Sequence, residues 1–301
     1  MKKRLSAAVL AAVLLLGLAG CGAGRGLRIV TTVFPVYDWV RVILGDGTGA
    51  ELVCLADGEN MHDYQPSDED LKAISDCDVF IFIGGASEAW AEQALSEARN
   101  GKMIVINLME TIGTEVRLEE RGDGSGAYDE HIWLSPQNAR MAVAYIAAVL
   151  GVADPKNADT YGQNADTYGY ELMLLDAAYV SAVREAAVKS LAFGGAFPFR
   201  YLTEAYGLEA YSAYPDCPAR GDTDAAGIAT LAGKADELGL PVILAAGEAD
   251  RAAAQSLADL MLSDPAVLVL EPMDESPAEG ATYLSVMEDN LTVLRQALGA
   301  K

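Results

Sequence analysis

The sequence predicts an α/β protein built of two doubly wound lobes, each with a parallel sheet, joined by a long rigid helix. Short β-branched or aromatic runs alternate with helix-length segments in both halves of the chain, and one longer helical pattern lies between the halves. Repeated strand–helix–strand alternation predicts a parallel sheet with helices on both faces. The length of 301 residues fits about two domains at roughly 150 residues each.

The first lobe is expected to span residues 28–155. Its predicted strands are 28–33, 51–55, 79–83 and 103–107, and its predicted helices are 36–44, 67–75, 88–98 and 136–150. Ser67 is a suitable N-cap for the second of these helices, and Pro136 is well tolerated in a first helical turn. Ligands of such sheets bind at the carboxyl ends of the strands. His62 follows the second strand, so it falls where a ligand loop is expected.

Residues 156–189 are predicted to form the helix that joins the lobes. A near-duplicated hexapeptide, Asn-Ala-Asp-Thr-Tyr-Gly, places Tyr161 and Tyr168 seven residues apart on one helical face, which we interpret as a packing surface. The second lobe, residues 190–301, repeats the alternation of the first. Its predicted strands are 191–193, 208–213, 241–245 and 266–270, and its predicted helices are 199–206, 224–238, 251–262 and 281–298.

The N-terminus carries the features of a bacterial export signal. Three basic residues precede an apolar stretch at residues 5–17, and Leu-Ala-Gly then leads into Cys21. This apolar run is too short for a membrane span and is typical of a secretory signal. Residues 1–20 therefore resemble a lipoprotein signal peptide, in which Cys21 becomes the lipid-bearing first residue and 21–27 form a tether. An ordinary cleaved signal that leaves Cys21 free is the alternative.

The net charge limits the classes of partner. The formal charge is −23, and loss of Lys2, Lys3 and Arg4 with the signal would make it −26. So acidic a chain is a poor ligand for nucleic acid or for anionic lipid surfaces. It is compatible with cation capture, although a solvated acidic surface accounts for most of the charge.

Three further cysteines, Cys54, Cys77 and Cys217, follow the lipidation signal. In an oxidising compartment one pair could form a disulfide and leave one thiol over. Cys54 ends one predicted strand and Cys77 precedes another, so we expect that pair to bridge. Three unpaired thiols are the alternative.

The two histidines of the chain, His62 and His131, each lie in a short polar segment beside acidic residues. Neutral imidazole is the commonest protein ligand for transition metals. The two histidines therefore predict a metal site. Helix capping or a place in a surface turn is the alternative interpretation of each.

Five segments together resemble the substrate-binding lipoproteins of bacterial ABC importers for zinc and manganese. They are 31–38 (TTVFPVYD), 62–66 (HDYQP), 78–85 (DVFIFIGG), 131–139 (HIWLSPQNA) and 197–202 (FPFRYL). Their order and spacing are far more specific than any one of them. The resemblance covers residues 28–298, almost the whole chain after the signal.

The resemblance implies a metal held in the cleft between the two lobes. His62 and His131 match its first two ligands. A carboxylate is expected after the last strand of the second lobe, where this chain has Glu271 and the family more often has aspartate. The third ligand is expected at residues 192–197, but Gly194, Gly195 and Ala196 offer no ligating side chain. Water, Glu248 or Asp222 could fill that place, or the site could be weakened.

The expected function is that of a receptor on the extracytoplasmic face of the cell membrane, anchored through Cys21, that delivers Zn²⁺ or Mn²⁺ to an ABC permease. We expect a monomer that catalyses no reaction. Two imidazoles among four nitrogen and oxygen ligands suit zinc, and more oxygen suits manganese. Two alternatives stay open: a receptor that binds metal weakly and recognises something else, such as a host surface, and a zinc hydrolase with an open coordination position.

Overall fold

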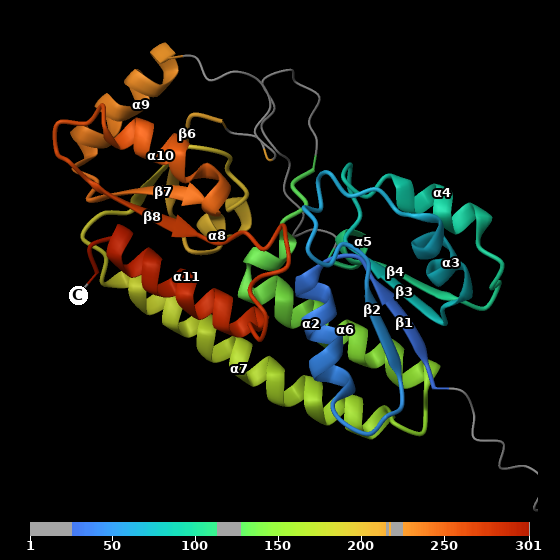
Figure 1. The fold of residues 1–301 in the computed structure, drawn as a ribbon. Coiled ribbons are helices and arrows are strands. Elements are labelled where there is room, and N and C mark those ends of the chain that lie inside the picture. The colour runs from blue at the N-terminus through green and yellow to red at the C-terminus, as the bar shows by residue number, and fades with distance from the viewer. Residues whose placement is uncertain (1–25, 113–127, 215–216, 218–224, 301) are drawn as a thin grey trace, which may run out of the picture.

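Two four-stranded parallel sheets, one in each half of the chain, form the framework of the molecule (Figure 1). The computed structural model describes residues 26–112, 128–214, 217 and 225–300. The first sheet has the order β2-β1-β3-β4, with β1 (Arg28–Thr31), β2 (Glu51–Cys54), β3 (Val79–Phe82) and β4 (Ile104–Asn107). The second has the order β6-β5-β7-β8, with β5 (Ser190–Phe193), β6 (Glu209–Ser212), β7 (Val242–Ala246) and β8 (Ala266–Leu270). The two strand orders are equivalent, and the predicted fold class is confirmed.

The helices follow the predicted alternation. The first half contains α2 (Phe34–Leu44), α3 (Asp68–Asp76), α4 (Trp90–Glu97) and α5 (Leu108–Ile112). The short η2 (Ile132–Leu134) leads into α6 (Pro136–Ala153) and α7 (Ala158–Arg184). The second half contains α8 (Arg200–Ala205), α9 (Ala225–Leu238), η3 (Glu248–Asp250), α10 (Arg251–Ala258) and α11 (Tyr283–Ala297). Within the described part of the chain, no helix combines the length and apolar character that crossing a membrane requires.

Helix α7 is the linking helix, although it is shorter at both ends than the predicted 156–189. It runs beneath both halves of the molecule, with α11 beside it (Figure 1). Tyr161 and Tyr168 are buried, as their common face predicted. The Asn164 side chain donates a hydrogen bond to the Ile43 carbonyl of α2, and the Tyr179 hydroxyl donates one to a carbonyl of α11. Helix α7 is therefore bonded to elements of both halves.

Buried contacts also join the two halves directly. Trp39 of α2 packs edge-on against Tyr283 of α11, with ring centroids 5.2 Å apart. Asp38 accepts a hydrogen bond from the backbone N–H of Tyr283, and Trp133 donates one from its indole to the Pro272 carbonyl at 2.8 Å. The loop after β8, which contains Pro272, is thereby held against the segment that starts α6.

The expected disulfide between Cys54 and Cys77 is wrong, because both residues are free thiols. Strand β1 lies between β2 and β3, so the strand that ends at Cys54 and the one that follows Cys77 are about two spacings of ~4.8 Å apart. The two cysteines also lie at opposite ends of their strands. A disulfide needs Cα atoms closer than about 7 Å. A position next to a strand does not predict a disulfide by itself, because the order of the strands in the sheet decides which cysteines lie close together.

Candidate metal centre

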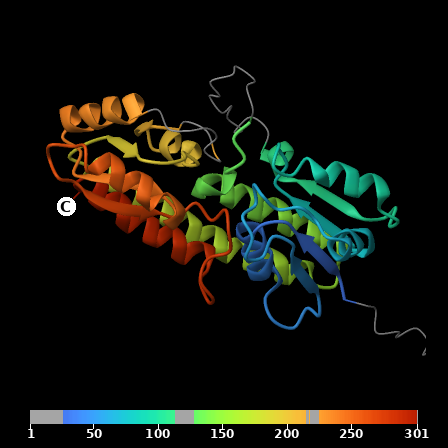
Figure 2. The same cartoon turned by 45° about the horizontal axis from the view of Figure 1, so that its top comes forward.

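Four side chains converge between the two halves of the molecule. His62, His131, Cys217 and Asp274 each offer one ligand atom, and these four atoms lie within 4.8 Å of one another. The two histidines come from the first half of the chain, and Cys217 and Asp274 from the second. The start of α6, just after His131, lies between the two sheets in both views (Figure 1, Figure 2). The two predicted histidines are therefore brought together.

His62 lies on the loop that follows β2, at the carboxyl end of the sheet as expected. Its Nδ1 atom is 2.9 Å from the Ser87 hydroxyl, and its Nε2 atom faces Cys217 Sγ at 3.4 Å and Asp274 Oδ2 at 3.7 Å. A partner on one ring nitrogen fixes the orientation of the ring and aims the other nitrogen. The N–H of Met61 donates to the Asp274 carbonyl, so the two loops are bonded to each other.

His131 is almost completely buried immediately before η2. Its Nδ1 atom is 2.8 Å from Asp129 Oδ1, and its Nε2 atom is 3.2 Å from Asp274 Oδ1. Asp129 is itself held in place, because its carbonyl accepts a hydrogen bond from Tyr201 and Arg200 lies 3.6 Å from its carboxylate. A carboxylate behind a histidine is the usual arrangement around a metal-binding imidazole.

The carboxylate expected from Glu271 comes instead from Asp274. Glu271 follows β8 as predicted, but its Oε1 atom accepts the N–H of Met273 and its own N–H donates to Asn290. The chain then turns at Pro272 and at Met273, which adopts a left-handed φ of 63°. This turn carries Asp274, three residues beyond Glu271, to the histidines. The expectation failed because it counted from the end of the strand and could not include the turn.

Cys217 occupies the place that the segment Gly194–Ala196 leaves empty. A side chain at Gly194 would meet the backbone of Ala254 in α10 at 2.2 Å, and Ala196 donates its N–H to Asp250 at 2.7 Å. This segment therefore packs on α10 and contributes no ligand. From the sequence, Cys217 is a candidate only for a disulfide. The one feature of the sequence that could have indicated Cys217 as a ligand is its position in the half of the chain where a ligand was missing.

The proposed replacement ligand Glu248 does not join the cluster. Glu248 is exposed on η3 and forms an ion pair with Arg251 at 2.6 Å. Together with Glu271 and Asp274 it lines a small pocket of about 200 Å³ beside the cluster. Asp222 and the predicted lipidation residue, Cys21, lie outside the described residues.

The electrostatics of the cluster favour a bound cation. Burial alone would lower the pKa of His62, but the adjacent Asp274 and Cys217 outweigh burial and raise that pKa to about 9. Burial also opposes charge on His131, yet its electrostatic interactions with Cys217 and Asp274 raise its pKa well above the ordinary value. The same histidines overcome the effect of burial on Asp274 and hold its pKa well below its usual range. In the metal-free protein, protons on the two histidines neutralise the negative charge of the cluster. A bound metal ion would neutralise the same charge.

Two buried atoms at the centre of the cluster lack hydrogen-bond partners. Among the described residues, His131 Nε2 and Asp274 Oδ1 are inaccessible and have no well-aligned hydrogen bond, and at 3.2 Å apart they pair with each other only when the imidazole is protonated. Buried polar atoms are nearly always satisfied, so each exception needs a physical reason. A metal ion bound between these atoms would satisfy both.

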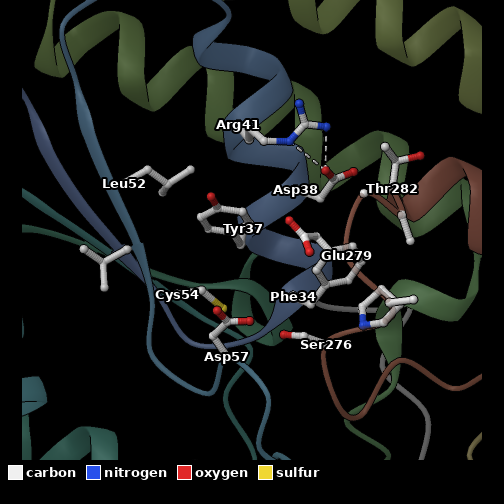
Figure 3. A pocket seen from close by; sticks show the side chains of 15 residues that line it. Phe34, Tyr37, Asp38, Arg41, Leu52, Cys54, Asp57, Ser276, Glu279 and Thr282 are labelled. Carbon is white, nitrogen blue, oxygen red and sulfur yellow. Dashed lines mark hydrogen bonds and ion pairs between the residues drawn. The ribbon is translucent and has the colours of Figure 1, made fainter.

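A larger cleft of about 600 Å³ lies between the lobes but contains none of the four cluster residues. Figure 3 shows its lining, which comes from α2, β2, Asp57 in the loop after β2, and residues 276–282. The Asp38–Arg41 ion pair, 2.7 Å long, crosses one wall. This cleft is therefore separate from the candidate metal centre.

Two buried carboxyl groups lie behind the His62 ligand loop. Glu130 accepts the N–H of Ser87, the residue whose hydroxyl contacts His62, and Glu88 accepts the N–H of Gly84 at 2.8 Å. Each of these glutamates keeps one buried oxygen without a hydrogen bond. Burial, with repulsion from Glu130, raises the pKa of Glu88 to about 7.

Glu88→Gln should therefore stabilise the protein above neutral pH. The folded-state pKa of about 7 lies above the ordinary value of 4.5, so wild-type stability falls as pH rises from 4.5 through 7. Glutamine does not titrate, and we expect its advantage to reach about 3 kcal/mol by pH 8 and to vanish near pH 4.5. Denaturant unfolding at several pH values measures this, with the exposed Glu92→Gln as control. An advantage of Glu88→Gln that does not change with pH would contradict the assignment.

Comparison with known proteins identifies the family. Residues 29–297 match the family described as "Zinc-uptake complex component A periplasmic" (ZnuA). The chain belongs to this family. The family consists of binding components of transport systems and not of enzymes, which sets the hydrolase alternative aside.

Several characterised ZnuA-family proteins are similar over most of this chain. The zinc-binding protein AdcA of Streptococcus pyogenes (serotype M3, strain MGAS315) is 30% identical over 291 residues, which cover 89% of this chain and 55% of AdcA. The chain thus spans about half the length of such relatives. The high-affinity zinc uptake system protein ZnuA of Bacillus subtilis (strain 168) is 29% identical over 293 residues, covering 92% of this chain and 89% of that protein.

Solved structures of similar proteins share the fold. The Zn(II)-bound ZnuA-like domain of Streptococcus pneumoniae AdcA has a TM-score of 0.73 and 30% identity, and the match covers 90% of this chain and 98% of that domain. The laminin-binding adhesin Lmb of Streptococcus agalactiae has a TM-score of 0.76 and 24% identity, with 91% and 100% covered. The likeness to the adhesin is one of fold alone.

Proposed function

We propose that this protein is a zinc receptor that delivers its metal to the permease of an ABC importer. One observation carries the proposal: His62 and His131 from one half of the chain and Asp274 from the other converge on a buried centre. Two imidazoles and a carboxylate are ligands that zinc accepts readily. Family membership and the zinc-binding relatives agree with this centre.

The position of the ligand residues in the two lobes supports a transport role, in addition to their chemical type. Each lobe contributes ligands, so a bound ion joins two parts of the molecule, and separation of the lobes would release it. Two histidines held by Ser87 and Asp129 are preorganised for the ion. A receptor that hands its metal to a permease needs both capture and release. We expect the mature chain to work as a monomer.

Zinc titration tests the proposal directly. Purified mature protein should bind one equivalent of zinc in competition with a chromophoric chelator, and His62→Ala and His131→Ala should each lose this tight binding. Glu248→Ala is the matched control, because Glu248 is exposed and paired with Arg251 outside the cluster. Wild-type protein that binds no zinc at micromolar concentration would support the weak-binding alternative instead.

We further propose that a lipid on Cys21 holds the receptor at the extracytoplasmic face of the membrane. Two relatives carry the word lipoprotein in their names, zinc-binding AdcA of S. pneumoniae and YcdH of B. subtilis. Cys21→Ala should move the exported protein from the membrane fraction to the soluble fraction, because a lipid and not a spanning helix would hold it. Immunoblots of the two fractions measure this. Exported mutant that stays in the membrane fraction would argue against a lipid anchor.

A further inference from the structure

We propose that Cys217 binds the metal as a thiolate and makes this receptor selective for zinc over manganese. The inference rests on the proposed function, because it names the residue that decides which ion the receptor carries. In this chain the segment Gly194–Ala196 packs on α10 and supplies no ligand.

The metal-free distances already suit a tetrahedral zinc site. Cys217 Sγ lies 3.4 Å from His62 Nε2 and 3.9 Å from Asp274 Oδ2, and Asp274 Oδ1 lies 3.2 Å from His131 Nε2. Zinc bonds of about 2.0–2.3 Å at tetrahedral angles place neighbouring ligand atoms roughly 3.3–3.7 Å apart. The three distances are close to this range and the four ligand atoms lie within 4.8 Å of one another, so side-chain movements of about 1 Å would bring the four side chains around a zinc ion.

The charges also balance only if the sulfur takes part as a thiolate. Neutral His62 and His131, the Asp274 carboxylate and a Cys217 thiolate together carry two negative charges, which match a divalent cation in a buried site. The thiol proton, together with the protons that keep His62 and His131 charged in the metal-free protein, passes to solvent or buffer when the metal binds. Without Cys217, the cluster among the described residues would offer three ligands and one negative charge.

Sulfur changes the choice of metal. Thiolates are soft ligands that zinc accepts, whereas manganese prefers carboxylate, carbonyl and water oxygens and a higher coordination number. Replacing a nitrogen or oxygen ligand by sulfur should therefore increase the preference for zinc over manganese. The neighbouring Glu271, which could offer more oxygen, is turned away and bonded to Met273.

Cobalt provides a spectroscopic test of the sulfur ligand in the mature wild-type chain. Co²⁺ in place of zinc should give a thiolate-to-metal charge-transfer band in the near ultraviolet. Cys217→Ser and Cys217→His should lack the band, and Cys54→Ser, which changes a thiol outside the cluster, should keep it. Cobalt bound to the wild type without the band, or a band that survives in Cys217→Ser, would overturn the assignment.

Competition titrations with Zn²⁺ and Mn²⁺ test the selectivity. Cys217→Asp should lower the ratio of zinc affinity to manganese affinity at least tenfold, whereas Cys217→His should keep zinc binding tight. An unchanged ratio in Cys217→Asp would refute selectivity through sulfur. Failure of the proposed function would look different, because the wild-type chain would then bind neither zinc nor cobalt tightly.

Discussion

Asp274→Asn should abolish tight zinc binding while the fold is retained. Its two carboxylate oxygens face both imidazoles, at 3.2 Å from His131 Nε2 and 3.7 Å from His62 Nε2. Asparagine has nearly the same shape but no charge, so the change removes one of the two negative charges that would neutralise the ion. Loss of a partner that only orients a ligand costs about 10–100-fold in metal affinity. Loss of the ligand itself should lower zinc affinity by more than this factor. Competition with a chelator measures the affinity.

The matched control for this substitution is Glu271→Gln. Glu271 lies three residues earlier on the same loop and also bears a carboxylate, but that carboxylate accepts the N–H of Met273, and Asn290 holds the Glu271 backbone. We expect its zinc affinity to stay close to that of the wild type. The reverse pattern, with binding lost in Glu271→Gln and kept in Asp274→Asn, would return the carboxylate ligand to Glu271.

Zinc should raise the thermal stability of the protein substantially. A ligand that binds only the folded state adds about 2.7 kcal/mol when its free concentration is 100 times Kd. For a chain of this size each kcal/mol shifts Tm by about 2–4 °C, so we expect a rise of about 5–10 °C. Both lobes supply ligands, and the ion should therefore stabilise the contacts between them as well as the loops. Calorimetry with buffered free zinc measures the shift.

His131→Ala should not respond to zinc in the same experiment. This substitution removes a buried ligand and frees Asp129, so the variant should melt at a lower temperature than the wild type before any metal is added. The quantity to compare between the two proteins is the difference in Tm with and without zinc. An equal zinc-induced rise in both proteins would place the stabilising ion elsewhere.

The helices and strands could be predicted from short stretches of sequence, because the burial pattern that produces each element is contained within that stretch. Buried parallel strands consist of apolar runs. The seven-residue spacing of Tyr161 and Tyr168 predicts a helix with one buried face, and both tyrosines are buried. Both histidines could be assigned to a site because each stands in a short polar segment beside acidic residues and matches a ligand position of the family it resembles, and His62 also follows a strand.

The rest of the site depends on geometry that local patterns do not contain. Asp274 rather than Glu271 reaches the histidines because the chain turns at Met273, and a left-handed φ at a methionine is not readable from the sequence. Cys217 meets His62 across 155 positions of chain. The expected disulfide failed for the same reason, since strand order is a property of the whole sheet.

Anomalous diffraction at the zinc absorption edge, from crystals of the zinc-loaded mature protein, locates the bound ion. We expect one strong peak per chain, within bonding distance of His62 Nε2, His131 Nε2 and an Asp274 oxygen. A single peak bound to other residues, or crystals with full-length side chains at these positions and no zinc between them, would contradict it.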